Sequence, residues 1–129
     1  MARYSHLISI IIPTFNEIQN IPKRMDECAQ FIDAEIIIVD GGSTDGTFEF
    51  VRDVASKNNQ VRLIHSQKGR AIQMNAGAAL ASGAWFVFLH ADTSLNRMSS
   101  DVLKKTINDK PELIGGAIYL KMDCLSSSY

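Results

Sequence analysis

The sequence predicts an α/β fold of three layers, in which a mostly parallel sheet carries helices on both faces. Three observations lead to this prediction. Apolar runs of strand length alternate with segments of helical periodicity. The strand-like runs are apolar at nearly every position, as expected for parallel strands buried on both faces. Polar and glycine-containing segments follow the ends of these runs, which is where open α/β sheets bind ligands.

The first two elements are a strand and a helix. Leu7–Ile12 is rich in isoleucine and stops at Pro13, so it predicts a buried strand. Asn20 is positioned to cap a helix that has Pro22 in its first turn. The apolar residues of this helix fall at spacings of four, three and four, which gives one buried face: Ile21, Met25, Cys28 and Ile32.

The middle of the chain continues the alternation. Glu35–Val39 predicts a second buried strand that ends at Asp40. A turn over residues 41–46 leads into a helix that Thr47 opens, followed by a short third strand at Val61–Ile64. The positions of this helix predicted to face inward are Phe48, Val51 and Ala55.

The second half adds the remaining elements. Gly69–Ser82 predicts a helix of small residues that ends at Gly83. Its apolar side is formed by Ile72, Ala76, Ala79 and Leu80. Trp85–Leu89 predicts the fourth and most apolar strand. A helix over Ser99–Asn108 and a fifth strand over Gly116–Met122, antiparallel or at an edge, complete the prediction.

Composition narrows the class of protein. The 129 residues suit one domain, and the net charge of -1 gives no basic excess for nucleic acid or an anionic membrane. Cys28 and Cys124 form no CxxC pair, which argues against a disulfide scaffold or a cysteine zinc site. The longest apolar run, Trp85–Leu89, is far shorter than the roughly 18 residues of a membrane span. We expect the chain in the cytoplasm, with the inner face of the membrane as an alternative.

Candidate site residues collect after the first four strands, and the carboxyl ends of parallel strands share one edge of the sheet. Taken in chain order they are Pro13, Thr14, Asn16 and Glu17, then Asp40, Gly41, Gly42, Ser43 and Asp45, then Lys68 and Arg70, and finally His90, Asp92 and Thr93. Four strand ends with polar groups are a stronger indication of a ligand site than any single motif.

The segment 40–47, DGGSTDGT, has the glycines of a phosphate-binding loop and precedes a helix. It is not a Walker loop, because Thr47 stands where the phosphate-binding lysine is required. The polar side chains of residues 43–45 are also typical of helix caps and turns. Asp40 ends a buried strand and needs a partner, for which a base or a ribose hydroxyl would suit.

Two further segments suit a charged ligand. In the segment 90–93, HADT, Asp92 with ligand phosphates suffices for magnesium or manganese, although capping of the next turn is an alternative. His90 as an isolated histidine equally suits a backbone hydrogen bond. Lys68 and Arg70 flank a glycine at a helix start, where they would either neutralise a diphosphate or form a solvated basic turn.

Four segments in this order resemble family-two glycosyltransferases with the GT-A nucleotide-diphospho-sugar fold. They are ISIIIPTFNE at 8–17, IIIVDGGSTDGT at 36–47, KGRAIQMNAGAALASG at 68–83 and FVFLHADT at 86–93. The resemblance implies that the nucleotide-sugar site is formed by Pro13, Thr14, Asn16, Glu17, Asp40, Gly41, Ser43, Lys68, Arg70, His90, Ala91 and Asp92.

The resemblance also implies a metal ligand. Asp92 stands at the second acidic position of the family's DxD motif and would hold manganese or magnesium on the diphosphate. His90 departs from the family pattern, because it occupies the first acidic position. The same histidine argues against a haloacid-dehalogenase-type phosphatase, whose nucleophilic aspartate would stand there.

The implied reaction is metal-assisted transfer of a sugar, with inversion, from a nucleotide-diphospho-sugar to an acceptor hydroxyl, with a UDP-sugar as the favoured donor. No acidic residue after Asp92 stands in a motif that identifies the catalytic base, the choices being Asp101, Asp109, Glu112 and Asp123. Since catalytic domains of the family are commonly longer, we expect residues 1–129 to be the donor-binding part of a glycosyltransferase, incomplete at the C-terminus.

Two alternatives follow from these expectations. A non-catalytic nucleotide-sugar-binding fragment or subunit would keep the donor motifs and lack the general base. A nucleotidyltransferase of related topology is less favoured, because it predicts a glycine-rich loop after the first strand, where this chain has PTFNE at 13–17. Apolar surface left open at the C-terminal side would favour a homo-oligomer.

Overall fold

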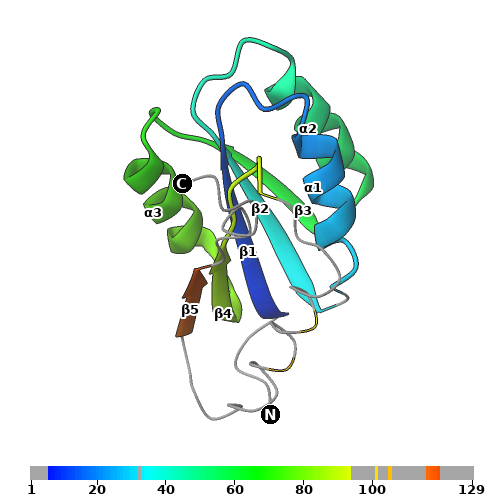
Figure 1. Ribbon diagram of the computed structural model, residues 1–129, viewed down its shortest axis with the longest axis vertical. Coiled ribbons are helices and arrows are strands. Elements are labelled where there is room, and N and C mark those ends of the chain that lie inside the picture. The colour runs from blue at the N-terminus through cyan, green and yellow to red at the C-terminus, as the bar shows by residue number, and fades with distance from the viewer. Residues whose placement is uncertain (1–5, 32, 94–100, 102–104, 106–115, 120–129) are drawn as a thin grey trace, which may run out of the picture.

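The computed structural model describes residues 6–31, 33–93, 101, 105 and 116–119. Five parallel strands form one sheet with the order β3-β2-β1-β4-β5 (Figure 1). The elements in chain order are β1 His6–Thr14, α1 Ile21–Cys28, β2 Ala34–Asp40, α2 Thr47–Lys57, β3 Val61–His65, α3 Arg70–Leu80, β4 Gly83–Phe88 and β5 Gly116–Tyr119. The last strand lies at an edge, as one of the alternatives predicted, and runs parallel to β4.

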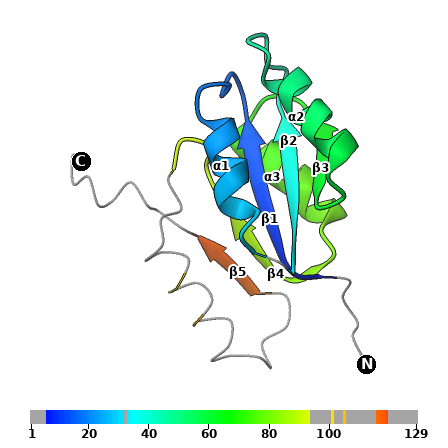
Figure 2. The same ribbon diagram turned by 90° about the vertical axis from the view of Figure 1, so that its right-hand side faces the viewer.

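Helices cover both faces of the sheet, with α1 and α2 on one face and α3 on the other (Figure 2). The larger core cluster joins the α1 and α2 face to residues such as Ile10, Ile12 and Ile36. The smaller cluster, on the α3 face, centres on Ile11 and Val39. Alternate residues of β1 therefore enter opposite cores, which explains why this strand is apolar without interruption. The predicted three-layer α/β fold is confirmed.

Helix α1 begins where predicted but ends earlier, at Cys28 rather than at Ile32, which lies outside the described residues. Asn20 occupies the N-cap position without forming a side-chain cap, so the capping prediction was wrong. Its backbone is helical, and its side-chain amide instead donates to Oε1 of Glu17 at 3.2 Å. The predicted apolar face is present, with Ile21 and Cys28 fully buried.

Helix α3 differs most from the prediction, because the side predicted to be apolar is largely exposed. Ile72 is 47% exposed and Leu80 is 37% exposed, whereas Gln73 and Gly77 are the buried residues of the helix. A Cβ atom at Gly77 would lie 2.5 Å from Cγ2 of Ile11, so the helix packs on β1 through a position that requires glycine. Gly83 does not end this helix, which stops at Leu80; it begins β4 instead.

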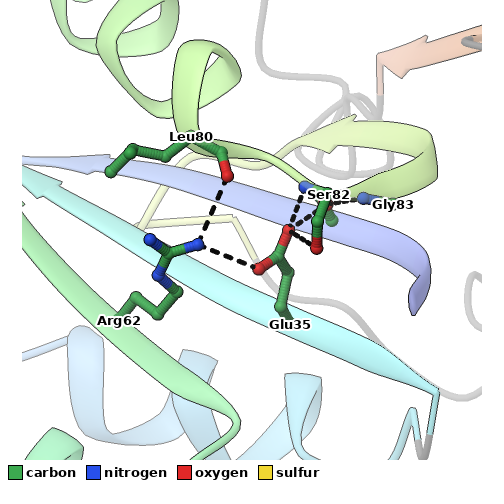
Figure 3. A network of polar contacts seen from close by, with 6 residues as sticks. Glu35, Arg62, Leu80, Ser82 and Gly83 are labelled. Atoms are coloured by element: carbon green, nitrogen blue, oxygen red, sulfur yellow. Dashed lines mark hydrogen bonds and ion pairs between the residues drawn. The ribbon is translucent and has the colours of Figure 1, made fainter. Parts of the chain in front are cut away.

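A buried carboxylate lies toward the amino ends of the strands, away from the predicted site (Figure 3). Oε2 of Glu35 accepts hydrogen bonds from the hydroxyls of Ser9 at 2.6 Å and Ser82 at 2.9 Å. Arg62 lies 3.5 Å from the other carboxylate oxygen and also donates to the carbonyl of Leu80 at 3.3 Å. These bonds attach the connection between α3 and β4 to the first two strands, and they supply the partners that a buried carboxylate requires.

Little of the predicted helix over Ser99–Asn108 lies inside the described residues. Asp101 and Lys105 are helical and exposed, and the others are not described. Within the described parts of the chain, every helix is too short or too polar to cross a membrane.

Candidate nucleotide-sugar site

The loop after β1 and the loop after β2 are joined by a series of hydrogen bonds at the carboxyl edge of the sheet. Three consecutive backbone N–H groups of the first loop donate to three side chains of the second: Asn16 to Ser43 at 2.8 Å, Glu17 to Thr47 at 2.9 Å and Ile18 to Asp45 at 3.1 Å. The polar residues of the DGGSTDGT segment therefore hold the PTFNE segment in place. Of the alternatives weighed for residues 43–45, the structure shows turn bonds at Ser43 and Asp45, whereas helix α2 has Gly46 at its N-cap and no side-chain cap.

Asn16 completes this connection in the reverse direction. Its side-chain oxygen accepts a hydrogen bond from the backbone N–H of Thr44 at 2.8 Å. Asn16 has a φ of 54°, in the left-handed region that asparagine tolerates better than most residues. The bond to Thr44 stabilises a backbone conformation that turns the chain sharply at the end of β1.

Asp40 is almost completely buried, with an exposed fraction of 1%. Oδ1 accepts from the hydroxyls of Thr14 at 2.9 Å and Ser43 at 2.6 Å. Oδ2 accepts from the backbone N–H groups of Gly42 at 2.9 Å and Ser43 at 2.8 Å. The partner that the sequence analysis required for this carboxylate is thus supplied by the chain itself. Asp40 fixes the shape of the turn after β2.

Asp45 carries the second carboxylate of this turn. Its Oδ1 accepts from the N–H and the hydroxyl of Thr47, at 3.0 Å and 2.5 Å. Desolvation acts to raise the pKa of Asp45, but the hydrogen bonds from Thr47 and Ile18 outweigh it, so the pKa lies below its usual value. The ionised carboxylate is therefore the form that this turn stabilises.

A pocket of about 180 Å³ opens beside the end of β1. Its lining comes from β1 and the loop after it, from the start of α3 and from the residue after Leu89: Pro13, Thr14, Phe15, Glu17, Lys68, Gly69, Arg70, Gln73 and His90. Six predicted site residues thus meet at one pocket: Pro13, Thr14, Glu17, Lys68, Arg70 and His90. The volume is below the roughly 300–1,000 Å³ of complete ligand pockets, so a nucleotide sugar would extend beyond it.

The charged groups of the pocket are mostly accessible. Lys68 and Arg70 are exposed, and the ammonium of Lys68 lies 4.0 Å from the centre of the Phe15 ring, a cation–π contact. Arg70 is also the first residue of α3, where unpaired backbone N–H groups and the helix dipole favour anions. This side of the pocket is therefore electropositive.

Gln73 is the buried polar residue behind the pocket. Its amide nitrogen donates to the carbonyls of Thr14 at 2.9 Å and Val39 at 2.8 Å, and its oxygen accepts from the N–H of Gly69 at 3.0 Å. One side chain thus binds the ends of β1 and β2 and the loop before α3. Gly41 packs against it, since a Cβ atom there would lie 3.0 Å from the Gln73 amide.

The HADT segment forms a turn after β4. The N–H of Thr93 donates to the carbonyl of His90 at 3.0 Å, and the carbonyl of Ala91 accepts from Nε of Arg24 in α1 at 2.8 Å. Ala91 and Thr93 are buried, whereas Asp92 is exposed between them. The other predicted site residues lie outside the pocket lining: Asn16, Asp40, Gly41, Gly42, Ser43, Asp45, Ala91, Asp92 and Thr93.

Phe15, Gln73 and Arg24 are not among the site residues predicted from the sequence. A signal existed for two of them. Arg24 lies at helical spacing from Ile21 and Cys28, so it is a charged residue on an apolar stripe, and it is 6% exposed. Gln73 lies four residues before the buried Gly77 and is 4% exposed. A polar residue on the buried face of a helix indicates a specific partner.

Comparison with known proteins identifies the family. The model of Glycosyl transferase family 2 matches residues 9–127. The chain belongs to this family. Glycosyltransferases of PGL/p-HBAD biosynthesis from Mycobacterium tuberculosis are 39% identical to this family 2 chain over 93 residues, which are 69% of the chain and 36% of the relative. The chain spans about a third of the length of such curated relatives.

Solved structures agree with the GT-A prediction. The mannosyltransferase PcManGT from Pyrobaculum calidifontis, in complex with GDP-Man and Mn²⁺, superposes on this family 2 chain with a TM-score of 0.61. It is 28% identical, and the match covers 71% of this chain and 28% of the other. Staphylococcus aureus TarS matches with a TM-score of 0.67 at 21% identity, over 81% of this chain and 20% of TarS, which supports the fold alone.

Proposed function

We propose that the chain binds a nucleotide-diphospho-sugar at the pocket beside β1 and serves the donor side of an inverting glycosyl transfer to an acceptor hydroxyl. The observation that carries the proposal is the meeting of Lys68, Arg70 and His90 around one pocket. These residues come from two separate segments of the sequence and lie beyond the carboxyl ends of parallel strands, the usual ligand position in such sheets.

The chemistry of the pocket suits the donor. Lys68 and Arg70 would bind phosphate oxygens, and the start of α3 adds backbone N–H groups of the same polarity. A nucleoside diphosphate that departs from the sugar gains negative charge, so these cations would stabilise it more strongly in the transition state than in the bound donor. Thr14, Phe15 and Glu17 would contact the remainder of the nucleotide.

The residues present fit a divalent metal held jointly with the donor. Among the described residues, no three His, Cys, Asp or Glu side chains gather as a metal cluster. A hard cation such as manganese or magnesium needs only one or two carboxylates when phosphates complete its shell. The exposed Asp92 lies two residues after His90 and would provide that carboxylate. The metal, when bound, would supply charge stabilisation for the leaving diphosphate.

The proposal also covers the identity of the nucleotide in the donor. We infer a UDP-sugar as the first candidate and a GDP-sugar as the second, because the related mannosyltransferase holds GDP-Man with Mn²⁺. A nucleotide-sugar-binding role without turnover is the alternative function. The general base is not assigned, since Asp101 is the only acid after Asp92 that the described residues include, and it is exposed.

The test is thermal unfolding of the 129-residue chain with UDP, GDP and their sugars, with and without Mn²⁺. A ligand at about 100 times its dissociation constant adds roughly 2.7 kcal/mol, which raises the midpoint by several degrees. Asp92→Ala should remove the metal-dependent part of the shift. Asp33→Ala, an exposed acid before β2 at the other edge of the sheet, should retain it.

The outcomes separate the functions. No shift with any nucleotide would contradict donor binding altogether. A metal-dependent shift accompanied by acceptor-dependent release of nucleoside diphosphate supports transfer. The same shift without release, over a range of acceptor hydroxyl compounds, supports the binding alternative.

A further inference from the structure

We propose that Arg24, in helix α1, is a positioning residue for the metal-binding carboxylate of Asp92. This inference rests on the proposed function, which gives Asp92 its metal. Arg24 is remote in sequence from the HADT turn, and nothing in the sequence pattern of that turn points to it. The structure nevertheless brings its guanidinium to the centre of the turn, at the carbonyl of Ala91.

Arg24 is held in one geometry. The residue is 6% exposed, and its NH1 group forms an ion pair with Oε1 of Glu27 at 2.7 Å, one turn along the same helix. Nε is then free to donate to Ala91 at 2.8 Å, 67 residues away in sequence. The two bonds hold the buried guanidinium in one orientation. Because the group is planar and pre-organised, it loses little conformational entropy when it forms them.

The Ala91 carbonyl, which accepts the bond from Arg24, lies in the middle of the HADT turn. It belongs to the residue between His90, which lines the pocket, and Asp92, which is exposed. The turn already has a bond from Thr93 N–H to the His90 carbonyl, and the N–H of Leu89 donates to the Ile11 carbonyl at 3.0 Å. The hydrogen bond from Arg24 attaches this turn to α1. It fixes the peptide plane that leads directly into Asp92.

The energetic argument favours a role in metal binding. A charge-assisted hydrogen bond to a carbonyl is stronger than a neutral one, so its loss would release the peptide plane before Asp92. Groups that orient a metal ligand without touching the metal commonly change metal affinity by about 10–100-fold when removed. Lys68 and Arg70 line the pocket from the start of α3 and the loop before it, a segment separate from the HADT turn, so we expect their contribution to nucleotide binding to persist without this bond.

The test separates metal affinity from nucleotide affinity. Calorimetric titration of UDP and of GDP into the 129-residue chain, at a series of Mn²⁺ concentrations, gives the metal-free affinity and the half-saturating Mn²⁺ concentration. For Arg24→Met we expect a half-saturating Mn²⁺ concentration about 10-fold higher. The metal-free affinity should remain within about twofold, because the cations of the pocket are unchanged.

Two further variants make the comparison specific. Arg24→Lys keeps the buried charge, but one ammonium replaces the two donor nitrogens that reach Ala91 and Glu27, so it cannot reproduce both bonds in the same geometry and should also require more Mn²⁺. This variant provides the answer if Arg24→Met does not fold, as judged by circular dichroism. Asp26→Asn, at an exposed carboxylate of the same helix, leaves both bonds of Arg24 in place and should match the wild type in both quantities.

An unchanged half-saturating Mn²⁺ concentration in the folded Arg24 variants would overturn the inference. So would an equal loss of metal-free and metal-dependent affinity, because that pattern indicates a general structural defect. If neither nucleotide binds the wild-type chain, the proposed function itself fails, and the inference fails with it. If a nucleotide binds without dependence on Mn²⁺, donor binding stands, but the metal at Asp92 and the inference are overturned. The wild-type titration therefore distinguishes the two failures.

Discussion

The hydroxyl of Thr14 donates a hydrogen bond to Oδ1 of Asp40 at 2.9 Å, and the two residues are also paired in register as the last residues of β1 and β2. The bond joins two strand ends at the point where the site begins. Because Asp40 accepts three more hydrogen bonds from the turn that follows, its carboxylate fixes both the end of the sheet and the turn.

The first prediction concerns the stability that this carboxylate provides. Asp40→Asn can keep one oxygen for the N–H groups of Gly42 and Ser43, but its NH2 group then faces the hydroxyls of Thr14 and Ser43, which lose their acceptor. Because the charge of the acceptor is lost as well, we expect the free energy of unfolding to fall by about 2 kcal/mol. Thr14→Val removes a single hydroxyl and should cost about 1 kcal/mol. Urea unfolding measures both. Asp53→Asn, at an exposed carboxylate of α2, should change stability by less than about 0.5 kcal/mol; equal stability of all three variants would contradict the assignment.

The second prediction concerns Gln73, which binds three backbone groups behind the pocket. Gln73→Met keeps the approximate volume but removes three hydrogen bonds, although the Thr14 carbonyl still accepts from the N–H of Gly41. We therefore expect a loss of about 3 kcal/mol in unfolding free energy. Gln73→Glu places a carboxylate against two carbonyls and should be no better. Because the loops that line the pocket lose their common attachment, nucleotide binding should weaken as well.

Gln67→Met is the matched control for Gln73. Gln67 is exposed in the loop before α3, so the same chemical change should leave both stability and nucleotide affinity close to wild type. Differential scanning fluorimetry with and without nucleotide measures both effects. A Gln73→Met protein as stable as Gln67→Met would show that the three bonds contribute nothing net.

The third prediction concerns pH and Asp45. Since hydrogen bonds from Thr47 and Ile18 hold the pKa of Asp45 below its usual value, the ionised form is favoured in the folded state. The stability it contributes is fully present above the unfolded pKa of about 3.9 and is lost as pH falls through the lower folded pKa. Asp45→Asn cannot titrate. The wild-type advantage in unfolding free energy should therefore be constant from pH 7 to about pH 5 and shrink below about pH 4. An advantage that grows on acidification would contradict this account.

Much of the fold could be predicted because its strands are buried on both faces. Every residue of β2 is buried, and the nearly continuous apolar run from Glu35 to Val39 is typical of a strand covered on both faces. The strand ends were predicted to within two residues: β1 runs through Pro13 to Thr14 instead of stopping at Ile12, and β4 ends at Phe88 instead of Leu89. Six predicted site residues accordingly line the pocket.

The remaining features depend on tertiary contacts that no local pattern contains. Whether Asp40 contacts a ligand or the chain depends on Thr14, which is 26 residues away. The hydrogen bond from Arg24 to the Ala91 carbonyl joins residues 67 positions apart in sequence. Helix α3 was misjudged for a related reason: its composition suggests burial of Ile72 and Leu80, but a close approach to β1 favours the side that carries Gly77.

The last prediction tests that close approach. Helix propensity alone predicts that Gly77→Ala would stabilise the protein by about 1 kcal/mol. The new Cβ atom, however, would lie 2.5 Å from Cγ2 of Ile11 and 3.0 Å from Cγ2 of Val39, and overpacking of this kind costs roughly 1–3 kcal/mol. The gain of about 1 kcal/mol offsets part of this cost, so we expect a net loss of up to about 2 kcal/mol in urea unfolding.

A double-mutant cycle identifies the cause of that loss. Ile11→Ala removes the methyl group in the closest contact and by itself should cost about 3 kcal/mol through the cavity it leaves. With the closest contact gone and only the 3.0 Å approach to Val39 left, Gly77→Ala should cost less in the Ile11→Ala background, a coupling of about 1 kcal/mol or more. Purely additive losses would mean that the contact with Ile11 is not what restricts this position to glycine. The sign of the coupling thus reports whether α3 is held against β1 at the separation that glycine allows.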